Sequence, residues 1–571
     1  MPVKSLYPDI DIPNVDLFTF LFERKDRPYA DEKRLFQDSE TNRAYTYASL
    51  KSTALEFGKG LRAILSWKKG EVLALYTPNS IDIPAIIWGT SWAGGVISPA
   101  NPGSTVQELV AQLKDSGARA LITQAPYLKA AMEACAQVGI ASDEIILIGD
   151  ERDPTNRIKH FTSIRNTTGA HRFRKAKINA AKDLAFLMYS SGTTGLPKGV
   201  MLSHRNIVAN VLQIEHAING NLSCSGELDG SGGDKLLACL PFFHIFGLTS
   251  VLHHTVRTGF VTVVMPQFEI KNWCRIVQTE HITFSYIVPP IMVLLATHPS
   301  AEGFDLSSLK MLNSGAAPLT RELIEAVYRR TRIPSKQGYG LTETSPSTHT
   351  QPWEEWDKSM GSVGKMLPNM EAKYVPVAAP DQEVTSTDAS VEVPVGVPGE
   401  LYLRGPNIFL GYWKQAELTR NCITEDGWFR TGDVGFQDEN GDFYITDRVK
   451  ELIKYKGFQV APASLEGLLA ASPLVNEAAV IGVWSKELET EVPRAYIVRK
   501  GGVGAKQEGD EKRIVDWVGE RVASHMKLRG GVRFVDQIPK SSSGKILRRV
   551  IKEAAEKQEL IDSREVAKAK L

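Results

Sequence analysis

The segment Tyr189–Val200 (YSSGTTGLPKGV) concentrates glycines and hydroxyl side chains around one lysine, which is the composition of a loop that holds an anion. Glycines let backbone N–H groups approach phosphate oxygens, hydroxyls add donors, and the lysine adds a mobile positive charge. A Walker A loop needs Ser or Thr directly after its lysine, whereas Gly199 follows Lys198. The sequence therefore predicts a phosphate loop of another kind, with a glycine-rich surface linker as the alternative. The candidate phosphate-binding residues are Ser190, Ser191, Gly192, Thr193, Thr194, Gly195 and Lys198.

Other segments place chemically active side chains beside glycines or aromatic residues. His244 stands among phenylalanines in PFFHIFG, and QGYGLTET sets Thr342 and Glu343 after a Gly-Tyr-Gly run. Asp433 and Lys545 lie in GWFRTGD and KSSSGKILRR. Each also has an ordinary structural interpretation, as a core histidine, a helix start, a turn former or a solvated basic stretch. Their occurrence together in one chain favours the functional interpretation.

Alternating helix and strand patterns surround the first of these segments. Residues 54–65 (ALEFGKGLRAIL) have helical periodicity, residues 72–76 (VLALY) predict a buried strand, and residues 184–189 (LAFLMY) predict a strand that leads into the glycine-rich loop. Repeated βα units predict a parallel, doubly wound sheet, whose ligands bind beyond the carboxyl ends of its strands. We therefore expect an α/β fold with the glycine-rich loop at the ligand-binding edge.

The pattern changes towards the C-terminus. From Gly399 onward, short strands separated by turns predict a small antiparallel β subdomain, and a further βαβ-like part follows residues 447–466. Because 571 residues exceed one hydrophobic core, we predict a large N-terminal domain, residues 1–446, and a small mobile α+β domain, residues 447–571. Residues 219–234 and 375–399 are predicted to be surface insertions.

The overall composition argues against several functional classes. The net charge is +1 without a long basic block, so we expect no nucleic-acid partner. Five cysteines without a C-x-x-C pair argue against a disulfide framework and a zinc site. Glycines interrupt the apolar run 83–97, so no transmembrane segment is expected. The last residues, Ala569, Lys570 and Leu571, are similar to the S-K-L signal and predict a peroxisomal import receptor as partner; a basic helical tail in a cytoplasmic enzyme is the alternative.

Seven segments occur in the order seen in adenylate-forming enzymes: YSSGTTGLPKGV, PFFHIFG, NSGAAPL, QGYGLTET, GWFRTGD, DRVKELIKYKGFQVAPASLE and PKSSSGKILRR. The chain resembles this superfamily over nearly its whole length, and within it looks most like 4-coumarate:CoA ligases and the related beetle luciferases. The resemblance implies that ATP activates a carboxylic acid as an acyl-adenylate with release of pyrophosphate, and that the thiol of coenzyme A then displaces AMP. ATP, Mg²⁺ and coenzyme A are the implied cofactors. Catalysis of such a reaction rests mainly on positioning and electrostatic stabilisation.

The resemblance assigns roles in the first half-reaction. Tyr339 would stack on adenine, Glu343 would hold Mg²⁺, and Asp433 would accept hydrogen bonds from the ribose hydroxyls. Arg448 would approach the ribose or phosphate side, and Lys545 would bridge the substrate carboxylate and the α-phosphate. The remaining implied nucleotide-binding residues are Gly315, Ala316, Ala317, Gln337, Gly338, Gly340 and Thr342.

A second set of residues is implied for thioester formation. Similar enzymes rotate their small domain between the two half-reactions, about a hinge that corresponds to Lys450. The rotation would bring Lys454 and Gln459 to the site, with Lys456 and Gly457 near the coenzyme A channel.

The resemblance also implies the acid pocket, in which His244 would orient the carboxylate and gate the entry of coenzyme A. Mostly apolar or small walls predict an aryl or medium-chain aliphatic acid. Asn313 takes the position directly before SGAAPL where plant coumarate ligases often carry lysine. The implied pocket residues are His244, Ile245, Phe246, Ser250, Asn313, Gly338, Gly340, Pro346 and Ser347.

Other functions compatible with these motifs are a luciferase-like oxidoreductase, which would adenylate and then oxidise a heterocyclic acid, and a carrier-loading enzyme. A non-catalytic acyl- or nucleotide-binding protein is disfavoured, because Glu343, Lys454 and Lys545 are all present.

Overall fold

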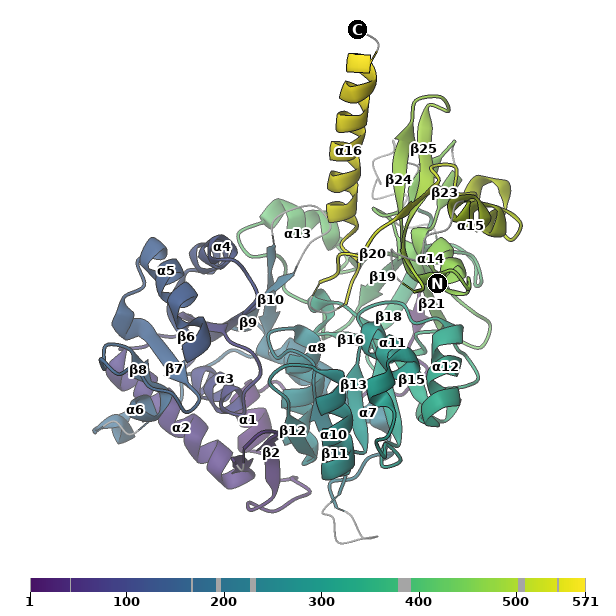
Figure 1. Cartoon of the computed structure of the whole chain (residues 1–571). Helices are drawn as coiled ribbons and strands as arrows, with labels where there is room; N and C mark the ends of the chain where they lie inside the picture. Colours follow the sequence, from purple (N-terminus) through teal and green to yellow (C-terminus); the bar gives the residue numbers. More distant parts are fainter. Residues whose placement is uncertain are drawn as a thin grey trace.

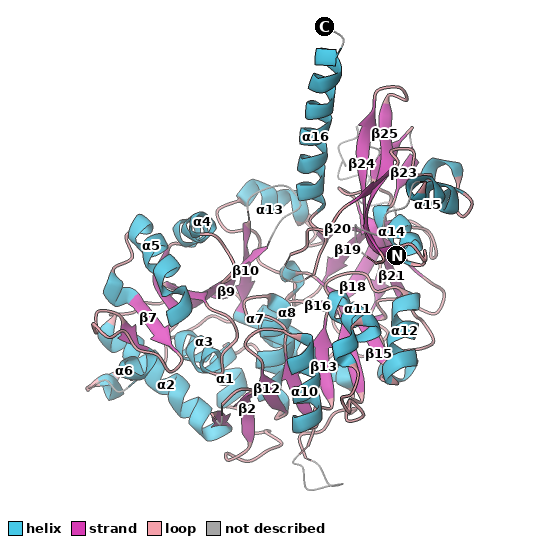
Figure 2. Ribbon diagram, in the orientation of Figure 1, coloured by secondary structure: helices cyan, strands magenta, loops and turns pink. Residues whose placement is uncertain are grey.

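The computed structural model describes residues 2–41, 43–165, 168–190, 197–225, 233–377, 392–456, 458–501, 509–541 and 544–569, with side chains described as far as residue 558. Within these residues, two large sheets and a smaller antiparallel sheet precede a C-terminal part built on two small sheets (Figures 1 and 2). The predicted α/β class, with a large N-terminal region and a smaller C-terminal domain, is confirmed. The boundary at residues 446 and 447 and the hinge near Lys450 stay predictions.

The first large sheet carries the glycine-rich segment at one edge. Its strand order is β10-β9-β5-β4-β6-β7-β8, parallel except for the antiparallel pairing of β10 with β9. All residues of β4 are buried, as expected for a parallel strand covered on both faces. The bounds are β4 (Val72–Tyr76), β5 (Val96–Ala100), β6 (Ala118–Gln124), β7 (Ile145–Ile148), β8 (Lys159–His160), β9 (Leu184–Ser190) and β10 (Lys198–Ser203).

Helices α2 (Tyr47–Ile64) and α3 (Asp82–Trp92), which belong to this region, approach each other through glycines. A Cβ atom on Gly58 would lie 2.4 Å from the carbonyl oxygen of Gly89, and one on Gly89 would lie 2.5 Å from that of Ala54. Gly89 of the apolar run 83–97 therefore serves the packing of these two helices. The other helices here are α1 (Leu17–Phe22), α4 (Val106–Ser116), α5 (Leu128–Val138) and α6 (Phe161–Arg165).

The second large sheet has the order β17-β16-β15-β14-β13-β11-β12-β2-β3, with parallel central strands. Its strands are β2 (Arg34–Asp38), β3 (Ala44–Thr46), β11 (Lys235–Ala238), β12 (Val261–Val264), β13 (Phe284–Ile287), β14 (Met311–Ser314), β15 (Ser335–Gly340), β16 (Ser347–Thr350) and β17 (Lys365–Met366). Its helices are α7 (His204–Ile218), α8 (Ile245–Gly247), α9 (His254–Thr258), α10 (Ile270–Glu280), α11 (Pro289–Thr297) and α12 (Arg321–Thr331), with a π-helical turn at Leu248–His253. One continuous hydrophobic core joins both large sheets.

The third sheet is antiparallel throughout, in the order β1-β18-β19-β20-β21, which confirms the expectation for the region after Gly399. It pairs the start of the chain with the strands that lead into the C-terminal part. The bounds are β1 (Val3–Lys4), β18 (Glu371–Val375), β19 (Gly399–Arg404), β20 (Phe429–Gln437) and β21 (Phe443–Arg448), with α13 (Ala416–Cys422) between β19 and β20.

The C-terminal part has its own hydrophobic cores. A hairpin of β22 (Ile453–Tyr455) and β23 (Phe458–Val460) precedes α14 (Pro462–Ala470). Strands β24 (Val475–Ser485), β25 (Thr490–Arg499) and β26 (Val532–Phe534) form the three-stranded sheet, with α15 (Asp510–Gly519) between β25 and β26. Helix α16 (Arg548–Ala569) projects away from the body of the molecule (Figure 1).

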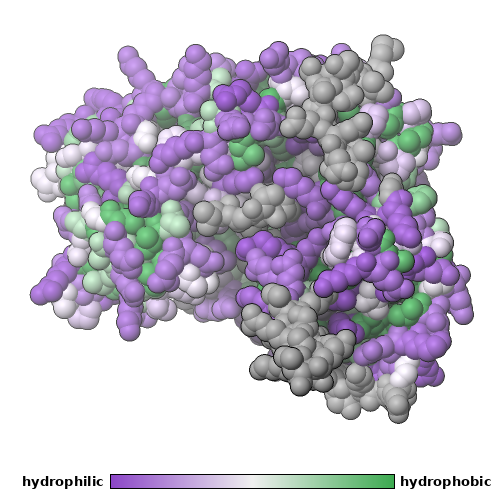
Figure 3. Space-filling view, turned by 90° about the horizontal axis from the view of Figure 1, so that it is seen from above, coloured by the Kyte–Doolittle hydropathy of each residue, from purple (hydrophilic) through white to green (hydrophobic). Residues whose placement is uncertain are grey.

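Seen from above (Figure 3), hydrophilic side chains predominate and hydrophobic ones gather in small groups. In the part of the chain that the structure describes, none of the helices combines the length and apolar character that crossing a membrane requires. All five cysteines are free thiols.

Candidate active site

The glycine-rich segment begins at the carboxyl end of β9, as predicted. Ser190 of β9 faces Lys198 of β10 across the antiparallel pair, so the two residues form the stems of the loop. The ammonium group of Lys198 lies 5.5 Å from the ring centre of Tyr412. The other predicted phosphate-binding residues lie outside the described residues: Ser191, Gly192, Thr193, Thr194 and Gly195.

Glu343 is held next to this loop by a tyrosine that sequence reasoning missed. Its carboxylate Oε1 accepts a hydrogen bond of 2.8 Å from the hydroxyl of Tyr412, the same ring that Lys198 approaches. The backbone oxygen of Glu343 accepts the N–H of Phe409 at 2.9 Å. Thr342 and Glu343 belong to a single 3₁₀ turn after β15, so the helix-start interpretation is also correct locally. A cation and a carboxylate thus both lie close to the side chain of Tyr412.

Asp433 is the centre of a buried polar cluster on β20. It is 2% exposed, its Oδ2 accepts the hydroxyl of Tyr339 at 2.5 Å, and its Oδ1 lies 2.9 Å from Nε of Arg448. The position of Arg448 opposite Asp433 in the β20–β21 register fixes this ion pair. Burial and the negative charge of Asp433 raise the pKa of Tyr339, and Asp433 also raises the pKa of Arg448. Tyr339 and Arg448 therefore stay protonated and hold the carboxylate in place.

Lys545 reaches this cluster from the C-terminal part of the chain. Burial, with Arg448 as the next cause, lowers the pKa of Lys545 to about 8, while Glu451 and Asp433 oppose the shift. The preceding Gly544 has a φ of 80°, and a Cβ there would lie 2.7 Å from Pro290 of α11. Only glycine fits so close to α11 with this backbone conformation. The Lys545 loop is therefore docked against the N-terminal domain.

Arg548, which the sequence analysis treated only as part of a basic stretch, anchors the segment after Lys545. Its guanidinium forms ion pairs with Glu451 and, at 2.6 Å, with Glu466 of α14. Burial raises the pKa of Glu466 to about 7, and Arg548 opposes that shift. The two carboxylates come from segments 97 and 82 residues away in the chain, so no local sequence signal indicates this pairing.

The β22–β23 hairpin carries the residues predicted for thioester formation. Lys454 is exposed and pairs in register with Gln459. The backbone N–H groups of Lys454 and Lys456 donate to side chains at the start of β25, Glu491 and Thr490, both at 2.9 Å. Gly457 lies outside the described residues. It is Lys545, and not this hairpin, whose charge interacts with Asp433 and Arg448.

His244 caps the short helix α8 and is neutral. Burial lowers its pKa to about 4, and its Nδ1 accepts the N–H of Phe246 at 3.3 Å. With Nδ1 acting as an acceptor, the proton of the neutral ring is on Nε2. His244 can therefore donate one hydrogen bond from Nε2 without bringing a positive charge.

Two glycines of the predicted site, Gly315 of the nucleotide-binding set and Gly340 of the acid pocket, lie in close contacts. The ring of Phe246 would lie 3.1 Å from a Cβ on Gly315, and the oxygen of Pro346 would lie 2.0 Å from one on Gly340. The backbone of Ser347 forms two hydrogen bonds with the Asn210 amide, of 2.7 and 3.0 Å. Ile245, Ser250 and Asn313 are buried.

The adenine-side residues form a loop after β14. Ala316 has a φ of 71°, an uncommon value for a residue with a Cβ, and Ala317 is half-buried. The amide oxygen of Gln337 accepts the N–H of Leu319 at 3.3 Å and so holds the end of this loop. Gly338 follows on β15.

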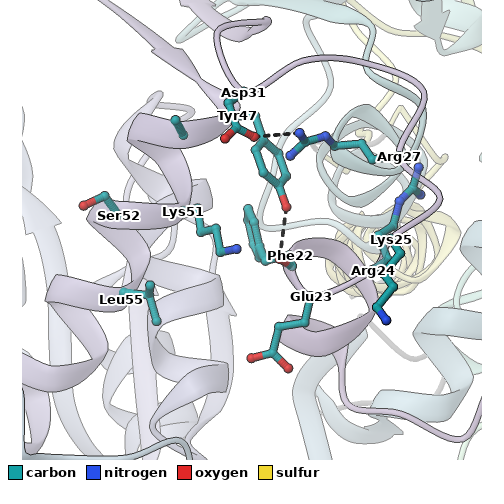
Figure 4. A pocket seen from close by; sticks show the side chains of 11 residues that line it. Phe22, Glu23, Arg24, Lys25, Arg27, Asp31, Tyr47, Lys51, Ser52 and Leu55 are labelled. Atoms are coloured by element: carbon teal, nitrogen blue, oxygen red, sulfur yellow. Dashed lines mark hydrogen bonds and ion pairs between the residues drawn. The ribbon is translucent and has the colours of Figure 1, made fainter.

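A surface cavity of about 480 Å³ lies elsewhere, between the end of α1 and α2 (Figure 4). At its wall the hydroxyl of Tyr47 donates to the oxygen of Phe22 at 3.0 Å, and Arg27 pairs with Asp31 at 2.6 Å. None of the predicted site residues lines it. The motifs and their contacts, rather than this cavity, identify the candidate active site.

Comparison with known proteins agrees with this geometry. Residues 22–413 match the AMP-binding enzyme family, and residues 464–545 match the AMP-binding enzyme C-terminal domain. The chain is 37% identical over 553 residues to a protein of Petroselinum crispum named 4-coumarate–CoA ligase 1, covering 96% of this chain and 95% of that one. ATP-bound MatB from Rhodopseudomonas palustris superposes with a TM-score of 0.81 at 27% identity, over 95% and 99% of the two chains. The anthranilate CoA ligase AuaEII in complex with anthranoyl-AMP superposes with a TM-score of 0.83 at 25% identity, over 96% and 99%.

The chain belongs to the AMP-binding enzyme family, the adenylate-forming superfamily that the motifs indicated. Within that family its sequence is 4-coumarate–CoA-ligase-like, so the resemblance predicted from the motifs is confirmed.

Proposed function

We propose that the protein is an ATP-dependent carboxylic acid:CoA ligase, which forms an acyl-adenylate and then an acyl-CoA thioester with release of pyrophosphate and AMP. The observation that carries the proposal is the position of Lys545, near the end of the chain, close enough to the buried ion pair of Asp433 and Arg448 for their charges to act on it. Adenylation needs such a cation beside the bound nucleotide, because two anions must be brought together there.

In the first half-reaction, two anions, the carboxylate and the α-phosphate, must be brought together. The Lys545 ammonium would lie between them, where its partial burial strengthens its attraction to both. Asp433 would accept the ribose hydroxyls, and Lys198 with the glycine-rich segment would hold the β- and γ-phosphates. Nε2–H of His244 would orient the acid. Each of these groups is positioned before the substrate arrives, so little reorganisation is needed.

The residues fit a Mg²⁺ ion. Among the described residues, no group of three or more His, Cys, Asp or Glu side chains could hold a metal by itself. Mg²⁺, however, is usually held by one or two carboxylates together with substrate phosphates. Glu343, oriented by Tyr412 beside Lys198, would supply that carboxylate. When bound, the ion would neutralise phosphate charge.

For the second half-reaction we propose that the C-terminal domain rotates near Lys450 and presents the β22–β23 hairpin. Lys454 and Gln459 would then replace Lys545 at the site, with Lys456 and Gly457 beside coenzyme A. The exposure of Lys454 in this structure supports the assignment of Lys545 to adenylation and of Lys454 to thioester formation.

The test is a coupled pyrophosphate-release assay over a panel of aryl and medium-chain aliphatic acids, with and without coenzyme A. We expect acid-dependent release, and a thioester only when coenzyme A is present. Absence of release with every acid would overturn the enzyme proposal. Oxygen consumption with a heterocyclic acid, without thioester formation, would instead support the luciferase-like alternative, which the similarity to CoA ligases does not favour.

We further propose that the protein enters peroxisomes, which rests on the sequence alone. Helix α16 leads to Ala569, while Lys570 and Leu571 lie outside the described residues. A tagged protein should lose peroxisomal import when Ala569, Lys570 and Leu571 are deleted. Unchanged import would contradict the proposal.

A further inference from the structure

The loop that carries Lys545 is closed on itself by backbone contacts. The N–H of Ser541 donates to the oxygen of Lys545 at 2.8 Å, and the N–H of Lys545 donates to the hydroxyl oxygen of Ser541 at 3.1 Å. At the base of the loop, the N–H of Leu547 donates to the oxygen of Pro539 at 2.9 Å. Because the two ends of the loop are tied together, a contact that fixes its base also fixes where Lys545 begins.

Arg548, the residue after Leu547, is held by two carboxylates. Its Nη1 donates to Glu451, and its Nη2 donates to Glu466 of α14 at 2.6 Å. All three side chains are only 12 or 13% exposed, so solvent ions screen these pairs little. Glu466 is fixed in turn, because its other oxygen accepts the N–H of Val480 at 2.7 Å. The guanidinium therefore has a defined place at the base of the Lys545 loop.

Glu451 connects Arg548 with the buried pair of Asp433 and Arg448. The N–H of Glu451 donates to the backbone oxygen of Arg448 at 2.9 Å, so these two residues share one turn. Asp433 raises the pKa of Arg448 most strongly, and Glu451 raises it further against the effect of burial. Burial lowers the pKa of Lys545 to about 8, and Glu451 opposes that shift. The Glu451 carboxylate therefore lies close enough to act on both cations.

These contacts give the Lys545 loop and the Asp433 pair a common support. The loop ends at Arg548, Arg548 pairs with Glu451, and Glu451 lies in the turn that begins at Arg448. Support of this kind matters because a lysine is a point charge on a flexible four-carbon stem. A displacement of about 1 Å in a reacting group can slow a reaction about 10²-fold.

We infer that Arg548 is a positioning residue for adenylation, which acts through its ion pair with Glu451 to hold the Lys545 ammonium where the carboxylate and the α-phosphate meet. Arg548 acts through Lys545 and needs no contact with either substrate. The inference rests on the proposed ligase function and adds a residue that sets the rate of its first half-reaction. The thioester-forming step, to which Lys454 is assigned, should not depend on Arg548.

The test measures the two half-reactions of Arg548→Met separately. Methionine keeps much of the length of the side chain but has neither its charge nor its hydrogen-bond donors. We expect acid-dependent ATP–pyrophosphate exchange to slow about 10- to 100-fold, with KM for ATP within about threefold. Conversion of a preformed acyl-adenylate to the thioester should stay within about threefold. Equal losses in both half-reactions indicate a general loss of structure and would contradict the inference, as would unchanged exchange.

Arg549→Met is the matched control. Arg549 is the next residue of α16, its side chain is 59% exposed, and it pairs with Glu553 at 2.8 Å within the same helix. Exposed pairs of this kind contribute little, so both half-reactions should stay within about twofold of the unmodified rates. Arg548→Lys keeps a charge without the forked geometry and should recover part of the lost exchange. A loss as large in Arg549→Met as in Arg548→Met would overturn the inference.

Glu451→Gln tests the ion pair itself, because the amide keeps the shape of the side chain and removes its charge. If Arg548 acts through Glu451, the double variant with Arg548→Met should exchange hardly more slowly than the slower single variant. Residues that act as a pair show such non-additive effects. Losses that multiply in the double variant would contradict action through the pair.

The pH profile adds a readout that a merely structural role would not move. Burial, Arg448 and Arg548 lower the pKa of Lys545, whereas Glu451 and Asp433 oppose the shift. Glu451→Gln removes one of the two opposing charges, so the fall of the adenylation rate at alkaline pH should begin at a lower pH than in the unmodified enzyme. An unchanged profile would contradict the position of Glu451 beside Lys545 and, with it, the inference.

Thermal melting checks that the variants fold. If Arg548→Met does not, Glu451→Gln and Arg548→Lys decide in its place: a loss confined to exchange supports the inference, and a loss shared by both half-reactions contradicts it. Failure of the ligase proposal looks different, because the unmodified enzyme would then release no pyrophosphate with any acid. An active unmodified enzyme together with a fully active Arg548→Met variant would overturn the role of Arg548 alone.

Discussion

Two lysines on the C-terminal part of the chain have opposite environments. Lys545 is partly buried against the N-terminal domain, and burial lowers its pKa to about 8. Lys454 is exposed on β22, and its backbone bonds to β25 within the same domain. The same part of the chain thus places one cation near Asp433 and Arg448 and keeps another in solvent. Under the proposed function, this is the arrangement expected for adenylation.

Contacts on the Lys545 side fix this arrangement. Arg548 pairs with Glu466 of α14, and Asp447 at the end of β21 accepts the N–H of Ala463 in the first turn of α14 at 3.0 Å. A carboxylate near a helix N-terminus is stabilising. The Asp447 contact links β21 to the part of the chain that carries both lysines. Rotation near Lys450 would have to rearrange the Asp447 contact.

The largest effect is expected from Lys545→Ala. Removing the cation that would stabilise the charge of two approaching anions should slow adenylation by about 10²- to 10³-fold. Acid-dependent ATP–pyrophosphate exchange measures this step. Lys540→Ala is the matched control, because Lys540 pairs with Glu477 at 2.8 Å and should leave exchange nearly unchanged. Full exchange activity in Lys545→Ala would contradict the assignment of Lys545 to the adenylation step.

Lys454→Ala should mainly impair the second half-reaction, by a smaller factor than Lys545→Ala impairs the first. We expect thioester formation to fall about 10- to 100-fold while adenylation stays within about twofold, because Lys454 would act only after rotation. Single-turnover measurements of each half-reaction give the two rates. Lys486→Ala, another exposed lysine of the same domain, serves as control. Equal losses in both half-reactions would refute the division between the lysines.

The pH dependence of adenylation should test the role of Lys545. If the Lys545 ammonium is required, kcat/KM for adenylation should fall above about pH 8, about tenfold per pH unit, because deprotonation removes the charge. Folding stability should change with pH in the opposite direction to activity. Because folding lowers the pKa of Lys545, the unfolded state binds more protons between the folded and unfolded pKa values, so the free energy of unfolding increases as pH rises through that range. Activity and thermal melting measured over pH 7 to 10 check both directions, and a flat activity profile would contradict the role of Lys545.

The smallest effect is expected from Tyr339→Phe. The change removes the hydroxyl that donates to buried Asp433 and leaves the ring in place. KM for ATP should rise about 3- to 10-fold, with a smaller change in kcat. Tyr444→Phe, on β21 with its ring stacked on Phe436, is the control in the same sheet. An unchanged KM for ATP would show that the ribose contact does not depend on this hydrogen bond.

Sequence patterns predicted much of the framework because local signals and burial agree there. The strands VLALY and LAFLMY appear as β4 and β9, and the apolar run near residue 83 appears as α3 followed by β5. The antiparallel region after Gly399 was also recognisable, since turns and alternating side chains are local features. The formation of such elements depends mainly on residues close together in the sequence.

The polar contacts of the site could not be predicted in the same way. The Tyr412 bond to Glu343 spans 69 residues, and the Tyr339 bond to Asp433 spans 94. Lys336 is 2% exposed and lies 5.9 Å from the ring centre of Trp353, 17 residues further along the chain, and no local pattern reveals this burial. Motifs predicted the reacting groups, whereas tertiary packing determines which groups orient them.

The most direct test supplies a preformed acyl-adenylate, made from an acid that the enzyme activates, together with coenzyme A to the Lys545→Ala and Lys454→Ala enzymes. Thioester formation is measured in a single turnover, so the adenylation step is bypassed. We predict that Lys545→Ala converts the adenylate at close to the unmodified rate and that Lys454→Ala does not. Slow conversion by Lys545→Ala and unimpaired conversion by Lys454→Ala would contradict the use of two faces of one domain for two reactions.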